Sequence, residues 1–135
     1  MIDISPKIKF VQTIASAQIT ADKTGDTIVD TQGYESACVV VIPSAVGTIS
    51  ESHYFTVNVS MGDDSALSDG ANLAAADFVD AAIPTIKSAT AGTPLIYGLA
   101  PTDRKRYLRV DLKESGTADL TCSVFILLAN PRHDD

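Results

Sequence analysis

The sequence predicts an all-β fold, an antiparallel β-sandwich of jelly-roll type with at most one short helix. About six to eight short segments rich in β-branched and apolar residues are separated by loops of Gly, Pro, Asp and Ser. Several of these segments alternate apolar and polar residues with the two-residue period of a β-strand. The apolar fraction is 45%, with 6% aromatic residues and no Trp, which suits a core of Val, Ile, Leu and Ala between packed sheets.

Three strands are predicted in the first third of the chain. The first covers 10–19, and a loop by composition follows it before a short second strand at 27–30. A turn leads into the third strand, 36–43, which is uniformly apolar. Such a strand is expected in the centre of a sheet, covered on both faces. Pro43 is expected to end it, because proline cannot donate a hydrogen bond to a neighbouring strand.

The middle of the chain contains one clearly half-buried strand, 53–61. Its apolar face consists of Phe55, Val57, Val59 and Met61, with Tyr54 and Thr56 on the other face. A long polar loop and an Ala-rich segment, 73–83, follow. That segment is expected to form either a brief helix capped by Asn72 or an extended crossover that stops at Pro84. Another strand is predicted at 93–99.

The last two predicted strands are 104–113 and 120–129. In the first, apolar and charged residues alternate, so the face with Lys105 and Arg109 is expected to contact solvent. The second is almost wholly apolar, and the loop between them has Gly116 at its centre. The pair is therefore predicted to form a closing antiparallel hairpin.

Length and charge limit the domain organisation and the partners. A chain of 135 residues fits a single domain, 1–135, with a flexible N-terminal segment at about 1–9 and a C-terminal tail at about 130–135. No apolar run approaches the roughly 18 residues of a membrane span, and Asp3 stands where a secretory leader carries bases. We expect a soluble protein made inside the cell, with no membrane partner. The net charge of −7 also argues against nucleic acid as a partner.

The two cysteines, Cys38 and Cys122, each lie in an apolar, strand-like run. Two buried free thiols are expected, with a disulfide between neighbouring strands as the alternative. Their wide separation, without a nearby pair of His, does not match a zinc site. No metal or other cofactor is expected.

Candidate reaction chemistry is sparse. The Asp-rich loop at 63–72 lacks the spacing of a calcium loop, since Ser68 replaces the required Gly and Ala74 the final Glu, so a solvated turn is expected. His53 and His133 could act as general bases, but no nucleophile elbow, phosphate loop or dinucleotide motif accompanies them. Catalysis is therefore not expected.

A basic cluster forms the candidate interaction site. Arg104, Lys105, Arg106 and Arg109 are four of the ten positively charged residues. Such a concentration in an acidic chain can orient an acidic partner surface. The alternative is the solvent face of a strand, where charged side chains discourage pairing between sheet edges.

Four segments resemble a known family: Val11–Ala15, Thr31–Ala37, Lys105–Val110 and Ala129–His133. In this order they are similar to small proteins encoded near the major capsid gene of tailed phages and prophages, the capsid decoration or cement proteins. The resemblance implies a virion structural protein on the capsid exterior that binds the major capsid protein as a dimer or trimer, without a cofactor. Segment 61–82 resembles the family's variable loop. The basic cluster would then be the candidate capsid contact.

Two other functions are compatible with the sequence. A different phage morphogenetic component, such as a head–tail connector or tail protein, would differ in the number of copies per particle. A carbohydrate-binding or adhesive β-sandwich is disfavoured by the absence of Trp, because sugar-binding platforms use exposed aromatic rings.

Overall fold

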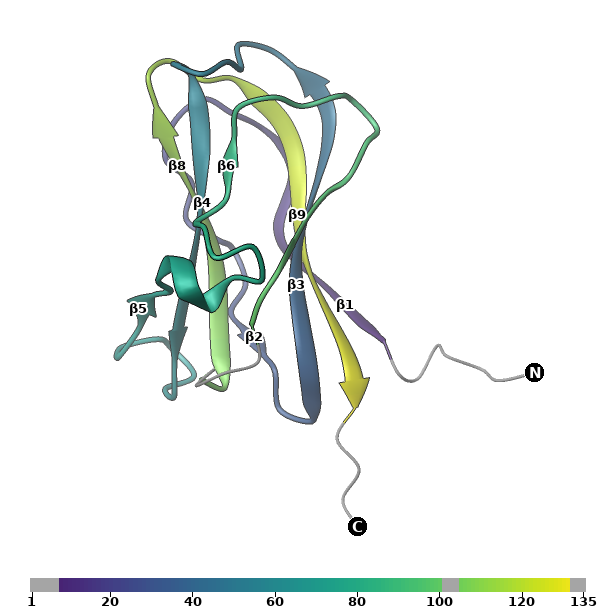
Figure 1. Ribbon diagram of the computed structural model, residues 1–135, viewed down its shortest axis with the longest axis vertical. Coiled ribbons are helices and arrows are strands. Elements are labelled where there is room, and N and C mark those ends of the chain that lie inside the picture. Colours follow the sequence, from purple (N-terminus) through teal and green to yellow (C-terminus); the bar gives the residue numbers. More distant parts are fainter. Residues whose placement is uncertain (1–7, 101–104, 132–135) are drawn as a thin grey trace, which may run out of the picture.

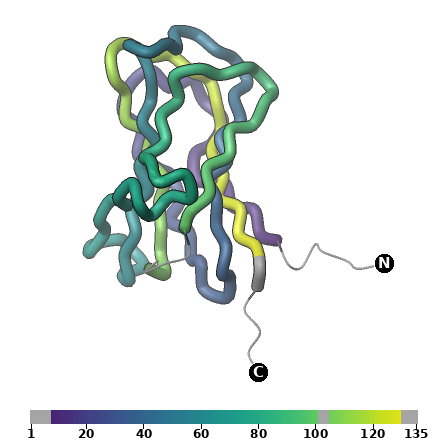
Figure 2. The backbone as a smooth tube through the Cα atoms, in the orientation of Figure 1, coloured from purple at the N-terminus to yellow at the C-terminus, as the bar shows by residue number. Residues whose placement is uncertain are grey.

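The computed structural model describes residues 8–100 and 105–131, which form two antiparallel sheets packed face to face (Figure 1). Sheet A has the strand order β1-β9-β3-β7, and sheet B has the order β2-β8-β4-β5, with β6 also paired to β4. Figure 2 shows the same two layers as a continuous tube. The predicted all-β sandwich is confirmed.

The strands of sheet A are β1 (Lys9–Ile19), β9 (Leu120–Pro131), β3 (Tyr34–Val46) and β7 (Leu95–Gly98). Those of sheet B are β2 (Val29–Asp30), β8 (Tyr107–Ser115), β4 (Tyr54–Gly62), β5 (Ala71–Asn72) and β6 (Thr85–Ile86). A 3₁₀ turn, η2 (Ala75–Asp77), precedes β6. The long strands lie where the sequence predicts them, whereas the two-residue strands β5 and β6 were not predicted.

The core lies between the sheets and follows the two-residue period. Alternate residues of β8 and β9 are almost inaccessible to solvent: Leu108, Val110, Leu112, Leu120, Cys122, Val124, Ile126 and Leu128. The predicted apolar face of β4 is also buried, from Phe55 to Met61. Each long strand thus contributes one apolar face to a shared core.

The predicted hairpin of the last two strands is wrong. β8 pairs with β4 and β2 in sheet B, whereas β9 pairs with β1 and β3 in sheet A. The chain crosses between the layers after β8, at the upper end of the sandwich in Figure 1. Gly116 has a positive φ of 74° in this connection, and Ala118 is buried. The alternation identifies the buried face of each strand, but two strands facing one core from opposite sheets have the same alternation as two paired strands.

The central position of β3 is confirmed, because it lies between β9 and β7. However, Pro43 does not end the strand, which continues to Val46. A register shift between Pro43 and Ala45 accommodates the missing N–H of proline, as β-bulges do. Coverage on both faces is only partial, since Cys38 and Ile42, which point away from the core, are half-buried.

The Ala-rich segment combines both predicted forms, a single helical turn within an extended crossover. Its N-terminal residue is Ala74 rather than Asn72, which belongs to β5, and the Asp77 carboxylate accepts a hydrogen bond from the Ala74 N–H at 2.9 Å. Beyond the turn, Phe78 forms a bridge with Leu99 beside β7. Phe78 is buried, so this segment closes the side of the sandwich next to β7.

The ends predicted to be flexible, about 1–9 and 130–135, fall mostly outside the described residues; of the part that is described, Lys9 begins β1 and β9 extends to Pro131. Within the described ranges, no helix has the length and apolar character needed to cross a membrane.

Candidate interaction surface

Arg106, from the predicted basic cluster, forms a bidentate ion pair with Asp30. The guanidinium donates from Nε and Nη2 to the two carboxylate oxygens, both at 2.9 Å. Hydrogen bonding from Arg106 holds the pKa of Asp30 at about 2, below its ordinary value of 3.8. Asp30 follows directly after Val29 in β2, so this pair fastens the short β2 strand to the beginning of β8.

Arg109 is also paired within the chain. Its Nε and Nη2 donate to Asp111 at 3.0 and 3.2 Å, on the outward side of β8. Asp111 Oδ1 also accepts a hydrogen bond from the Gly25 N–H at 2.8 Å. An ideal Cβ at Gly25 would collide with the carbonyl oxygen of Val110, so the 20–26 loop approaches β8 as closely as only glycine allows.

Lys105 lies 3.5 Å from Asp63 through its ammonium group, and Arg104 falls outside the described residues. The structure therefore brings Lys105, Arg106 and Arg109 to one strand and its start, each beside a carboxylate of its own chain. These pairs neutralise much of the local positive charge. A partner contact through the cluster stays a prediction.

The Asp-rich loop forms the expected solvated turn. Asp64 accepts hydrogen bonds from the N–H groups of Ala66 and Ser68, and Asp69 accepts from those of Asp63 and Asp64. These backbone bonds lower the pKa of both carboxyl groups, with the Ser68 N–H as the largest cause for Asp64 and the Asp63 N–H for Asp69. The carboxylates thus act as internal braces of the turn.

Both cysteines are free thiols. Cys38 pairs in register with Leu127, five residues along β9 from Cys122, so roughly 17 Å of strand separates the two positions. Cys122 points into the core, where burial raises its pKa to about 11, and Cys38 points outward from sheet A. The alternative of a disulfide between them is wrong in this fold.

His53 has a structural role in the connection between the sheets. Its Nδ1 accepts a hydrogen bond from the Thr117 N–H at 3.0 Å. Thr117 lies between β8 and β9, so His53 braces the crossover that replaces the predicted hairpin. His133 falls outside the described residues.

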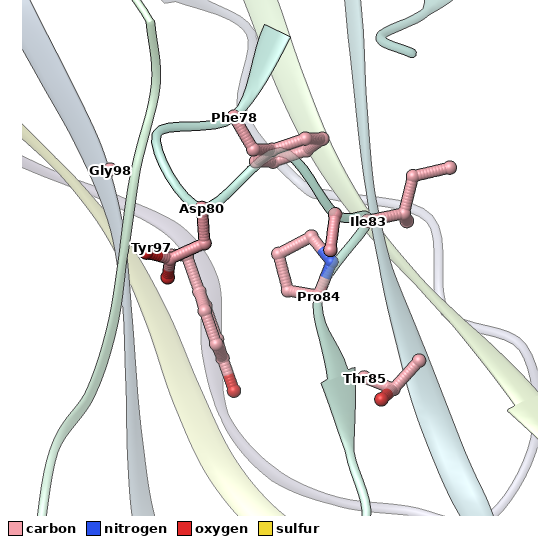
Figure 3. Close-up of a pocket in the computed structure, with 8 residues that line it drawn as sticks. Phe78, Asp80, Ile83, Pro84, Thr85, Tyr97 and Gly98 are labelled. Carbon is pink, nitrogen blue, oxygen red and sulfur yellow. The ribbon is translucent and has the colours of Figure 1, made fainter. Parts of the chain in front are cut away.

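A shallow recess of about 190 Å³ lies between β7 and the segment that follows η2 (Figure 3). Figure 3 shows the rings of Phe78, Pro84 and Tyr97 around it, and Asp80 also lines it. Burial raises the pKa of Tyr97. The volume is below the roughly 300 Å³ typical of small-molecule sites, so the recess suits a side chain of a partner better than a free substrate.

The outer face of sheet A carries no charge over most of its area. Charged residues are absent from 10–19, 36–46, 95–98 and 120–129, which make up nearly all of its four strands. This is unusual in a chain with a net charge of −7. Cores of protein interfaces are depleted in charged residues, so the face is a candidate contact surface.

One half of this face is apolar and partly exposed. Phe10 is 52% exposed, Ile96 64% and Val79 67%. The Phe10 ring contacts the Phe125 ring edge-on, with centroids 5.1 Å apart, and Phe125 is next to Val40 in register. We call the following set of residues the apolar patch: Ile8, Phe10, Cys38, Val40, Ile42, Val79, Ile96, Phe125 and Leu127.

The patch reaches beyond β7 through Val79. The Val79 N–H donates to the Gly98 carbonyl at 3.0 Å, which places 79 along the free edge of β7. An ideal Cβ at Gly98 would come within 2.9 Å of the Val79 side chain, so the glycine leaves room for that side chain on the outer face. At the opposite end the face is polar, and Gln18 donates to Asp119 at 3.1 Å.

This patch was not predicted as a site from the sequence. Its signal was present in the apolar β3, which was interpreted as a strand covered on both faces, and in the almost wholly apolar β9. The structure covers one side with sheet B, and the outer side remains partly exposed.

Comparisons with models of protein families and with curated proteins give no match. Among solved structures, a chain in the structure of infectious bursal disease virus, Gx strain, is similar over 96% of this chain, with a TM-score of 0.45 and 12% sequence identity. This chain spans 33% of the length of that viral chain. At this TM-score and identity, the likeness assigns neither a family nor a function.

Proposed function

We propose that this protein is a structural component of a virion that decorates the outside of a phage capsid and stabilises it by binding the major capsid protein. The observation that carries the proposal is the charge-free outer face of sheet A with its exposed apolar patch, because such a surface on an acidic chain serves contacts with other proteins, whether the capsid protein or a second copy in a decorating oligomer. The sequence resemblance to capsid decoration proteins supplies the kind of partner.

The rest of the described structure fits a scaffold. The carboxylates of Asp64 and Asp69 hydrogen-bond within their own turn, and His53 hydrogen-bonds to the connection between β8 and β9. The recess beside Tyr97 is small. We propose that the protein acts without catalysis and without a cofactor. Many weak contacts repeated over a symmetric shell then sum to a large stabilisation, since binding at one site raises the effective concentration at the next.

The direct test compares purified capsid shells with and without the protein. We expect decorated shells to resist heat to a higher temperature, and the number of bound copies to match the repeated capsid subunits or symmetry axes. Shells of equal heat resistance in both preparations would contradict the stabilising role. A copy number that fits only a single ring at one vertex would favour the head–tail connector instead.

The capsid-contact role of the basic cluster has its own test. Replacing Arg104, Lys105 and Arg106 by Ser is expected to weaken shell binding without unfolding the domain. The matched control is Asp30→Asn, which breaks the same ion pair but keeps the Arg106 cation. If Asp30→Asn reduces shell occupancy as strongly as the triple variant does, the cluster only holds β2 in place.

A further inference from the structure

The apolar patch lies on the outer face of sheet A, which the described residues leave partly exposed. Over 37–42 of β3 and 124–129 of β9 both sides of the strand are apolar, which is the composition of strands buried between two layers. Their inner sides pack against sheet B, whereas Cys38, Phe125 and Leu127 on the outer side are only half-buried. The outer side therefore has the composition of an interior, but residues 8–100 and 105–131 supply no second layer to cover it.

Charge determines which partner can supply that layer. Each copy carries a net charge of −7, so two copies repel each other wherever charged surfaces meet. The outer face of sheet A is the exception, because its strands carry charge only at Lys9 and Glu35. A second copy can approach this face with little desolvation of charged groups, and it presents the same apolar side chains.

The area is sufficient for a dimer. The strands of sheet A have 11, 12, 13 and 4 residues, and at about 3.3 Å per residue and about 4.8 Å between strands they give a face on the order of 600 Å². Two such faces bury about 1,200 Å² in total, at the lower end of the range for stable specific interfaces.

We propose that two copies of this chain associate through the outer faces of sheet A, with the apolar patches packed against each other about a two-fold axis. Such an interface is closed, because a two-fold axis pairs the same face of both copies and the sheets of the described residues offer no second charge-free face, so association stops at the dimer. The dimer is then a four-layer stack with sheet B on both outsides. This inference concerns the isolated chain and does not depend on a capsid partner.

The test measures the mass of the full chain in solution by sedimentation velocity over a range of concentrations. Wild type is expected at about twice the 14.2 kDa of one chain. Ile96→Lys introduces a charge at an exposed position of the patch, and the two-fold axis introduces it twice, so the dissociation constant is expected to rise on the order of 30-fold or more.

The matched control is Asn58→Lys, which changes the net charge equally on the outward side of sheet B, opposite Asp111. It is expected to remain dimeric. Val79→Lys is a second patch variant at a more exposed position, in case Ile96→Lys does not fold. Circular dichroism of each variant checks the fold.

Salt and thiol chemistry give two independent readouts. Because the copies repel each other outside the interface, added salt is expected to strengthen association. Since Cys122 is buried, alkylation of the folded chain reports on Cys38, which lies in the patch. Its alkylation rate is expected to fall several-fold as wild type dimerises and to be independent of concentration in Ile96→Lys.

Two results would overturn the proposal. One is a wild-type dimer that Ile96→Lys and Asn58→Lys affect equally. The other is a chain that stays monomeric at every accessible concentration while Ile96→Lys abolishes binding to capsid shells, which would make the shell itself the second layer.

Discussion

The outer faces of the two sheets differ in charge and in exposure: sheet B carries charged side chains that are paired within the chain, and sheet A carries uncharged, partly exposed ones. On sheet B, Arg106 and Arg109 are paired with carboxylates of the same chain, and the 20–26 loop lies against β8. On sheet A, the outward positions are uncharged and Ile96 is largely exposed. The charged groups on the outside of sheet B therefore pair within the chain, whereas apolar side chains on the outside of sheet A stay partly exposed, as expected of the contact surface proposed above.

The difference shows that the same strand composition, apolar on both sides, is compatible with two different arrangements. A strand that is apolar on both sides is buried between two layers, but the second layer can come from the same chain or from another. In β3 the outward Val40 is only 5% exposed, because Phe125 and Ile96 lie on either side of it in register. The sheet thus protects its centre and exposes its margins.

The largest expected effect comes from placing a charge at the centre of each face. Val40→Asp buries a carboxylate among uncharged neighbours, so we expect it to destabilise the fold by about 2–4 kcal/mol. Thr56→Glu places a carboxylate opposite Lys113 on sheet B, where we expect a change of about 0.5 kcal/mol or less. Urea denaturation measures both. Equal losses in the two variants would remove the distinction between the faces.

A smaller loss of stability is expected from displacing the 20–26 loop, which lies against the outer side of β8. Gly25→Ala forces the 20–26 loop away from the Val110 carbonyl and weakens the hydrogen bond to Asp111. We expect a loss of about 1–3 kcal/mol in the free energy of unfolding. Thr24→Ala, an exposed neighbour, is the control and is expected to change little. A Gly25→Ala variant as stable as wild type would show that the loop contributes little to sheet B.

The smallest expected effect concerns pH and the Arg106–Asp30 pair. Because the folded pKa of Asp30 is about 2 and its ordinary value 3.8, its contribution to stability is complete above pH 3.8 and is lost as pH falls toward 2. Asp30→Asn removes this contribution, so its stability is expected to fall less over that interval. Urea midpoints measured from pH 5 to 2 compare the variants. Parallel curves for wild type and Asp30→Asn would contradict the assigned pKa.

The buried faces of the strands were predictable from the sequence, because burial in a two-layer sandwich imposes a period of two on each strand. The strand neighbours of β8 and β9 were not predictable, because the two strands have the same alternation whether they pair in one sheet or face each other across the core. The end of β3 was wrongly predicted at Pro43, because the composition does not reveal the bulge that lets the strand continue. The Arg106–Asp30 ion pair was not predictable, because Asp30 comes next to β8 only in the folded chain. The hydrogen bond from the Gly25 N–H to Asp111 likewise depends on how the 20–26 loop folds onto β8.

The most direct test of the sheet A contact is hydroxyl-radical footprinting of the aromatic side chains of the isolated protein, without capsid shells, comparing dilute monomer with concentrated dimer. Phe10 and Phe125 lie on the outer face of sheet A, and Tyr54 and Tyr107 on that of sheet B. We predict that assembly protects Phe10 and Phe125 from oxidation and leaves Tyr54 and Tyr107 unchanged. Protection of the two tyrosines with no change at the two phenylalanines would contradict the assignment of sheet A as the contact surface.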